Sequence, residues 1–169
     1  HVNSKINPVE DLETIKTEIN LSDIDIIQKK LEKGKKKLLQ EKEIQILERK
    51  LKQLNEGKET TINDEFEKKF LYTMGLLSFK PKIIVCNVDE ESLAKGNSFT
   101  ENVKKNFTEE KIITICADIE DQIMGLDDNE RETFMKEIGL NKTGLNQLIK
   151  EGYDLLNLDT FFTSGPEES

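Results

Sequence analysis

Two short apolar runs constrain the fold of this chain most strongly. Ile83–Cys86 and Ile112–Cys116 are rich in β-branched residues, a composition typical of strands that are buried on both faces of a sheet. About 25 residues separate the two runs, and they include a helical stretch at Thr100–Phe107. Strands that are joined through a helix run parallel, so the sequence predicts an α/β unit.

The N-terminal third carries helical periodicity instead. Asp11–Leu39 and Glu41–Asn55 place apolar residues three or four positions apart, which gives each predicted helix an apolar stripe. Each stripe needs a partner, and the nearest one is the other helix. We therefore expect an antiparallel coiled-coil hairpin that turns at residues 34–40, with Gly57 as the stop of its second helix.

Four further helices and a third strand complete the predicted layout. Asn63 is expected to cap a helix that reaches about Leu77. Its core-facing residues are expected to be Phe66, Phe70, Met74 and Leu77. The remaining elements are helices at 119–125, 129–138 and 144–157, the last capped by Thr143, and a strand at 158–163.

Charge is abundant and unevenly distributed. Charged residues make up 35% of the chain, against about 25% in average domains, and the net charge is −9. Residues 28–58 carry a net charge of +6, which leaves −15 for the rest. A basic appendage on an acidic body often binds a polyanion, although a solvated helix face is the commoner cause. The candidate polyanion-binding residues are Lys29, Lys30, Lys33, Lys35, Lys36 and Lys37. Because these are all lysines, they predict diffuse attraction, and no sequence-specific binding of DNA or RNA is expected.

Other patterns exclude several classes of protein. Cys86 and Cys116 cannot build a disulfide framework, and together with His1 they are too few for a structural zinc site. We therefore expect a reducing, cytoplasmic environment and no metal ligands in this chain. No apolar run approaches the roughly 18 residues that a membrane span needs, so no membrane partner is expected.

Polar residues follow the first buried run directly. Asn87, Val88 and Glu90 stand where P-loop GTPases carry an Asn-Lys-x-Asp motif at the end of a strand. In those proteins the Asp accepts hydrogen bonds from the ring N–H and the amino group of guanine. Here Val88 replaces the Lys and Glu90 replaces the Asp. By itself this motif is weak evidence, because in most sequences such a pattern is only a polar turn that leaves a strand.

A second candidate motif follows the other run. Cys116, Ala117 and Asp118 stand where the same proteins have a Ser-Ala-Lys turn, whose backbone N–H contacts the base. Ligands of open α/β sheets bind at the carboxyl ends of the strands, so two motifs at this edge support one another. For Cys116, a role as a small buried apolar residue is the simpler interpretation.

With these motifs in place, the chain resembles the YchF or Obg-like ATPases, which are P-loop proteins of the translation-factor class. The matching segments are residues 7–33, 80–94, 119–140 and 143–168. The resemblance implies the C-terminal half of a P-loop G domain with an inserted helical hairpin. In its terms, residues 1–10 form a connecting segment, 11–58 the hairpin, 59–164 the G-domain part and 165–169 the start of a linker to a TGS domain.

The resemblance also implies which parts of a nucleotide site this chain supplies. Asn87 would bond the purine's N7 edge, Val88 would pack on the ring, Glu90 would face its six-membered ring and Ala117 would offer its N–H. No phosphate-binding Gly-x-x-x-x-Gly-Lys-Ser/Thr motif occurs, since Lys142–Thr143 lacks the preceding glycines. ATP or GTP with Mg²⁺ would therefore find its phosphate and metal ligands outside this chain, and no catalytic residue is expected within it.

Three functions remain open at this stage. The first is part of an ATP-preferring hydrolase that associates with the large ribosomal subunit, as the resemblance implies. The second is a non-catalytic module whose basic hairpin binds RNA or the ribosome. The third is a purely structural coiled coil, which is least favoured because two heptads are short for independent assembly.

Overall fold

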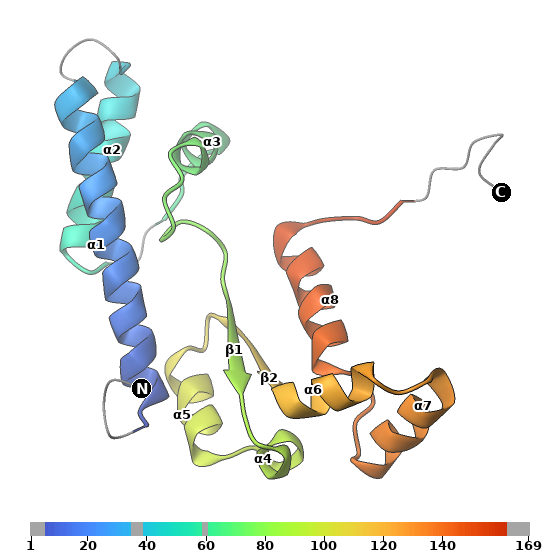
Figure 1. Cartoon of the computed structure of the whole chain (residues 1–169). Helices are drawn as coiled ribbons and strands as arrows, with labels where there is room; N and C mark the ends of the chain where they lie inside the picture. The colour runs from blue at the N-terminus through green and yellow to red at the C-terminus, as the bar shows by residue number, and fades with distance from the viewer. Residues whose placement is uncertain (1–5, 35–38, 59–60, 162–169) are drawn as a thin grey trace, which may run out of the picture. The chain divides into compact units, whose positions relative to one another are not determined.

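The computed structural model describes residues 6–34, 39–58 and 61–161, and the chain divides into two compact units, His1–Lys80 and Pro81–Ser169. The first unit contains the helices α1 (Pro8–Gly34), α2 (Glu41–Asn55) and α3 (Glu65–Thr73) (Figure 1). The second contains β1 (Ile83–Asn87), α4 (Glu90–Lys95), α5 (Ser98–Asn106), β2 (Lys111–Ile115), α6 (Ala117–Met124), α7 (Asp128–Glu137) and α8 (Gly144–Leu156).

In the first unit, α1 and α2 lie side by side and bury their apolar stripes together (Figure 1). The buried core of this unit comprises Ile27, Leu31, Ile46, Leu47, Leu54, Leu71, Leu76 and Phe79. Both predicted helices are present, although α1 ends at Gly34, and residues 35–38 of the expected turn lie outside the described residues. Gly57 follows α2 with φ of +62°, as expected for a helix stop. The coiled-coil character of the pair stays a prediction.

The third helix differs from its prediction at both ends. Asp64, and not Asn63, caps α3, because its carboxylate accepts a hydrogen bond from the Glu67 N–H at 2.7 Å. The helix stops at Thr73, and Gly75 then takes a positive φ of +73°. This early end turns Leu77 outward to 45% exposure. The prediction that Phe66 faces the core is also wrong, since it is 43% exposed, whereas Phe70 and Met74 do pack against the core.

Two buried carboxylates attach the α3 region to the helix pair. Asp23 of α1 accepts hydrogen bonds from the N–H groups of Leu77 and Ser78, at 3.0 and 2.7 Å. Glu67 of α3 forms ion pairs with Arg49 and Lys50 of α2, at 2.5 and 2.6 Å. Because both carboxylates are removed from water, these contacts fix where α3 lies within the unit.

The second unit is built on two parallel strands. β1 pairs with β2 in the register Ile83↔Lys111 to Asn87↔Ile115, which confirms the predicted parallel α/β connection. The prediction of strands buried on both faces is wrong for the described residues, since Val85 is 41% exposed and Ile113 is the one fully buried strand residue. The physical reason is that the sheet has only two strands in this part of the chain, and α8 packs against β2.

The helices of the second unit follow the predicted order with one addition, and one predicted strand is not formed where the structure describes it. The short helix α4 was not expected, because six residues are too few to show a periodicity. The predicted strand at 158–163 is wrong where the structure describes it: residues 158–161 are irregular, and the others lie outside the described residues. Asn157 takes a left-handed conformation that ends α8, and residues 158–161, the described part of the predicted strand, pair with no neighbouring strand.

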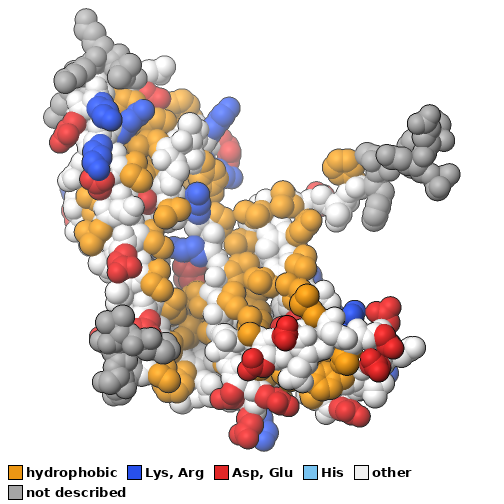
Figure 2. Space-filling view, viewed as in Figure 1, with side chains coloured by type: hydrophobic (Ala, Val, Ile, Leu, Met, Phe, Trp, Pro, Cys, Tyr) orange, Lys and Arg blue, Asp and Glu red, His pale blue; other side chains and the backbone are white. Residues whose placement is uncertain are grey.

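An apolar stripe remains exposed along α8. Figure 2 shows apolar side chains gathered over this helix. The stripe consists of Leu145, Ile149, Tyr153 and Leu156. In the part of the chain that the structure describes, no helix has the length and apolarity to span a bilayer.

Candidate functional site

The parallel register places the two sequence motifs at one edge of the sheet. Asn87 and Ile115 are the last paired residues of β1 and β2. Beyond them, the side-chain Oδ1 of Asn87 accepts a hydrogen bond from the Ala117 N–H at 3.0 Å. The Val88 N–H donates to the Ile115 carbonyl at 2.8 Å. The two motifs, which lie 30 residues apart in sequence, are therefore held together directly.

The first motif contains two adjacent carboxylates with different surroundings. Asp89 caps α4 by accepting a hydrogen bond from the Ser92 N–H at 2.8 Å. The Ser92 side chain and this N–H hold the pKa of Asp89 below its ordinary value. Glu90 is the first residue of α4, and its side chain is exposed. The Asp89 carboxylate is thus occupied by the N-terminus of α4, whereas the Glu90 carboxylate is accessible to a ligand.

The second motif forms the start of α6. Cys116 is 1% exposed and packs with Ile119 and Ile123, which agrees with its interpretation as a small apolar residue. Ala117 and Asp118 follow as exposed residues of the first turn. Cys116, the N-cap residue of this helix, makes no side-chain hydrogen bond to it, and the Ala117 N–H donates to the side chain of Asn87. The N–H that the sequence assigned to a ligand therefore serves to join the motifs.

A third contact, which the sequence reasoning missed, supports this edge. Glu120 of α6 accepts hydrogen bonds from the N–H groups of Gly144 and Leu145 at the start of α8, at 2.6 and 3.1 Å. A Cβ at position 144 would lie 2.6 Å from the Ile115 side chain, so glycine is required there. A contact between residues 24 positions apart has no local signal in the sequence.

These groups suit recognition of a polar ring and not bond cleavage. An amide, a carboxylate and uncapped helix N–H groups can bond the edge of a heteroaromatic base. Burial raises the pKa of the Cys86 thiol, which disfavours the reactive thiolate. Among the residues that the structure describes, no cluster of His, Cys, Asp and Glu could hold a metal ion.

The predicted polyanion-binding lysines belong to the first unit. Lys29, Lys30 and Lys33 are exposed on the last turns of α1. Lys35, Lys36 and Lys37 lie outside the described residues. Lys29 forms an ion pair with Asp25, at 2.5 Å. The described lysines line a cavity of about 510 Å³ that also contains apolar side chains.

Comparison with known proteins gives consistent matches along the chain. The sequence is 37% identical, over 179 aligned residues, to the ribosome-binding ATPase YchF of Escherichia coli O157:H7, covering 99% of this chain and 48% of that protein. The Bacillus subtilis protein of the same name is 34% identical, with 99% and 49% covered. No family model matches the chain.

A solved structure matches the fold. The Schizosaccharomyces pombe YchF GTPase superposes with a TM-score of 0.83 at 24% identity, over 98% of this chain and 48% of that one. The chain thus spans about half the length of the curated relatives that it matches. The resemblance that the sequence predicts is confirmed: over 99% of its length the chain is similar to proteins named YchF.

Proposed function

We propose that this chain forms the base-binding half of the nucleotide site in a ribosome-associated P-loop ATPase of the cytoplasm. The observation that supports the proposal best is the hydrogen bond from the Ala117 N–H to Asn87, which joins the two candidate motifs at one sheet edge. The names of the relatives, ribosome-binding ATPase and GTPase, point to the same class. Hydrolysis itself is assigned to residues outside this chain.

Each base-contacting group has a defined part in this proposal. The Oδ1 of Asn87 is occupied by Ala117, so its Nδ2 donates to N7 of the purine. Val88, which is half-buried, provides apolar surface next to the ring, whereas Cys116 is buried and packs with Ile119 and Ile123 at the start of α6. Since the Ala117 N–H is engaged, the base-facing N–H is that of Asp118, at the uncapped start of α6.

Glu90 determines the choice of base. Guanine presents two adjacent donors, which a short Asp meets bidentately. Glu is one methylene longer, so it crowds that edge or leaves one donor without an aligned partner. Adenine has no 2-amino group to accommodate. An unmatched buried polar group costs about 1–3 kcal/mol, so we expect ATP to be preferred over GTP by roughly ten- to hundredfold.

Exchange of this carboxylate tests the assignment. In the full-length protein, Glu90→Asp should move the ATP-to-GTP affinity ratio toward GTP, and adding Val88→Lys should move it further. Competition binding with both nucleotides measures the ratio. Glu91→Asp, the same change at the next exposed residue of α4, is the matched control and should leave it unchanged. If Glu90→Asp leaves the ATP-to-GTP affinity ratio unchanged, Glu90 does not determine the choice of base.

We also propose that the basic hairpin supplies part of the contact with the large ribosomal subunit or its RNA. The net charge of +6 on residues 28–58 supports this, because neutralised phosphates release counterions. If the hairpin acts without hydrolysis elsewhere in the protein, the chain is a binding module and not part of an enzyme.

Charge reversal in the hairpin tests this second proposal. Lys35→Glu, Lys36→Glu and Lys37→Glu together should weaken cosedimentation with ribosomes and reduce its salt dependence, while nucleotide turnover stays near normal. Reversal of Lys95, Lys105 and Lys150 changes the net charge equally at sites in the second unit and is the control. Unchanged association of the hairpin variant at low salt would show that these lysines do not contact the ribosome.

A further inference from the structure

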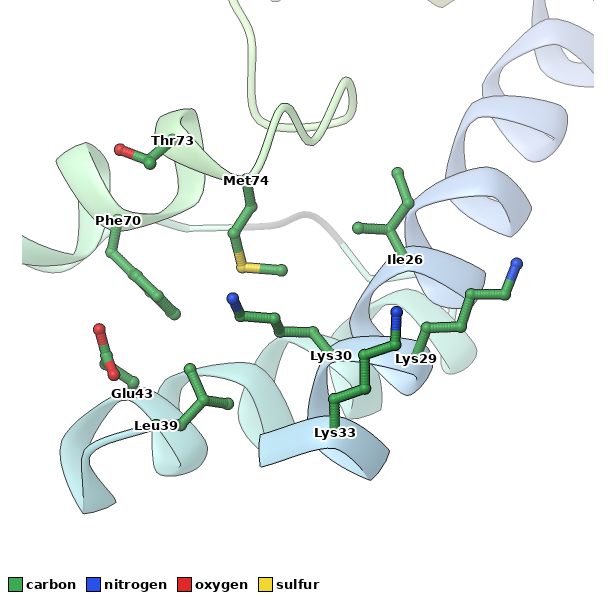
Figure 3. A pocket seen from close by; sticks show the side chains of 9 residues that line it. All are labelled: Ile26, Lys29, Lys30, Lys33, Leu39, Glu43, Phe70, Thr73 and Met74. Atoms are coloured by element: carbon green, nitrogen blue, oxygen red, sulfur yellow. The ribbon is translucent and has the colours of Figure 1, made fainter. Parts of the chain in front are cut away.

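The first unit contains a cavity that combines an apolar floor with a basic rim. It lies between the last turns of α1, the start of α2 and α3, and Figure 3 shows its lining side chains. Its apolar residues are Ile26, Leu39, Phe70 and Met74. All four also pack against the buried core, so the floor is held in place by the fold. The volume of about 510 Å³ exceeds that of any single side chain.

The lysines of the rim are not equivalent. Lys29 is neutralised by Asp25 and turns away from the cavity (Figure 3). Lys30 extends between Phe70 and Met74, with its ammonium group over the floor (Figure 3). Among the described residues, neither Lys30 nor Lys33 has a carboxylate within ion-pair distance. Two cations at the mouth of an apolar cavity are complementary to an anionic ligand with an apolar part.

The lining favours an apolar side chain over a nucleobase as the inserted group. Single-stranded nucleic acids bind through aromatic side chains on which bases stack, and Phe70 is the one aromatic residue here. Three of the four floor residues are aliphatic or thioether groups, and Met74 can adapt to different shapes. Such a floor resembles the grooves that accept hydrophobic anchors of amphipathic peptides.

We propose that this cavity binds an acidic protein segment, which inserts one apolar side chain between α1 and α3 and places its carboxylates on Lys30 and Lys33. Glu43 at the α2 side accepts a hydrogen bond from the Gln40 N–H at 2.8 Å and so stays at its helix end. This carboxylate limits the acidic groups of the ligand to the α1 side. The proposal concerns a different unit from the nucleotide site and does not depend on it.

The probe is a short synthetic peptide with a central leucine between aspartates, titrated against the full chain by fluorescence anisotropy. Replacing the leucine with glycine should weaken binding about tenfold or more, as expected for the loss of a buried anchor. Replacing the aspartates with lysines should abolish binding. Equal binding of the leucine and glycine peptides would overturn the proposal, because it would show attraction by charge alone.

Variants of the chain locate the site. Thr73→Trp should fill the cavity and weaken the leucine peptide about tenfold, without removing a core residue, since Thr73 is exposed and its hydroxyl bonds only the Lys69 carbonyl. Thr17→Trp is the matched control, because Thr17 is an exposed helical threonine with the same bond to Glu13. Lys30→Glu with Lys33→Glu should weaken the peptide, whereas Lys16→Glu on the same helix should not.

A competition experiment distinguishes a peptide from a nucleic acid as the ligand of the cavity. An oligouridylate that binds the hairpin through charge alone can compete for Lys30 and Lys33, but its own binding should be insensitive to Thr73→Trp. Tight oligouridylate binding that is lost with Thr73→Trp would overturn the proposal and assign the cavity to a nucleic-acid base. Peptide binding that is identical in the Thr73→Trp and Thr17→Trp chains would overturn it as well.

Discussion

Glu67 is a buried carboxylate whose ionisation depends on two basic neighbours. Burial by itself raises its pKa, but the hydrogen bonds from Lys50 and Arg49 and their charges outweigh burial and hold the pKa below its ordinary value. Lys50 is itself fully buried and also donates to the Thr61 carbonyl. Neither charge is therefore tolerated without the other.

This arrangement predicts an acid-sensitive contribution to stability. Because the pKa of Glu67 is lowered on folding, its contribution is fully present above the ordinary glutamate pKa of about 4.3 and is lost as the pH falls through the lower folded value. We expect Glu67→Gln to lower the free energy of unfolding by about 3–5 kcal/mol near neutral pH and by progressively less in acid. Urea denaturation over this pH range measures both.

The neighbouring glutamate of α3 provides the control. Glu65 is 89% exposed and makes only a surface pair with Lys68, at 3.6 Å. Glu65→Gln should change the free energy of unfolding by less than about 1 kcal/mol at every pH. An equal effect of the two substitutions, or an effect of Glu67→Gln that does not shrink in acid, would contradict the assignment.

At the scale of elements, two glycines of α8 make opposite predictions. A Cβ at Gly144 would lie 2.6 Å from the Ile115 side chain and 2.9 Å from the Glu120 carboxylate, whereas nothing lies within 4 Å of one at Gly152. Gly144→Ala should therefore lower the free energy of unfolding by about 1–3 kcal/mol, because α8 must move away from β2. Gly152→Ala should raise it by about 0.5–1 kcal/mol through helix propensity.

Thermal denaturation of the two variants beside the unchanged chain measures this contrast. The same chemical change in one helix controls for propensity, so only packing distinguishes the two sites. Stabilisation by Gly144→Ala would show that α8 does not pack tightly against β2 and Glu120.

Helices with a sustained apolar periodicity or a strong N-cap residue could be predicted from the sequence. The span of α2 and the Thr143 cap of α8 were both predicted, because an apolar stripe and a capping hydroxyl are local signals. The helix α4 could not be predicted, because six residues are too few to show a periodicity. The strand expected at 158–163 was predicted wrongly where the structure describes it, because a strand forms only where a neighbouring strand pairs with it. Asn63 and Asp64 are both good caps, and only the fold decides between them.

The candidate site was predictable in position but not in its bonds. Two motifs at the ends of parallel strands had to meet at one edge, whatever the details. That the Ala117 N–H bonds Asn87, or that Asp89 and not Glu90 caps α4, depends on side-chain directions that no spacing determines. The cavity beside Lys30 was invisible for the same reason, because its lining comes from three helices.

At the scale of the whole molecule, the chain matches about half the length of its relatives. The nucleotide site that we propose for it contacts the base and includes no ligand for the phosphates. Phosphates supply much of the grip on a nucleotide through Gly-rich loops, and the chain has no such motif. We therefore expect the chain alone to bind ATP only in the millimolar range, equivalent to about 4 kcal/mol or less. Since base contacts alone remain, adenosine should bind about as weakly as ATP.

Isothermal titration of the chain with ATP and with adenosine tests this expectation. The two ligands share the base and the ribose and differ only in the phosphates. The ratio of their affinities therefore measures the contribution of the phosphates directly. A ratio near one places all contacts of this chain on the nucleoside. Micromolar ATP binding, or ATP far tighter than adenosine, would mean that phosphate-binding groups lie within these 169 residues and that the site is not the edge formed by Asn87, Glu90 and Ala117.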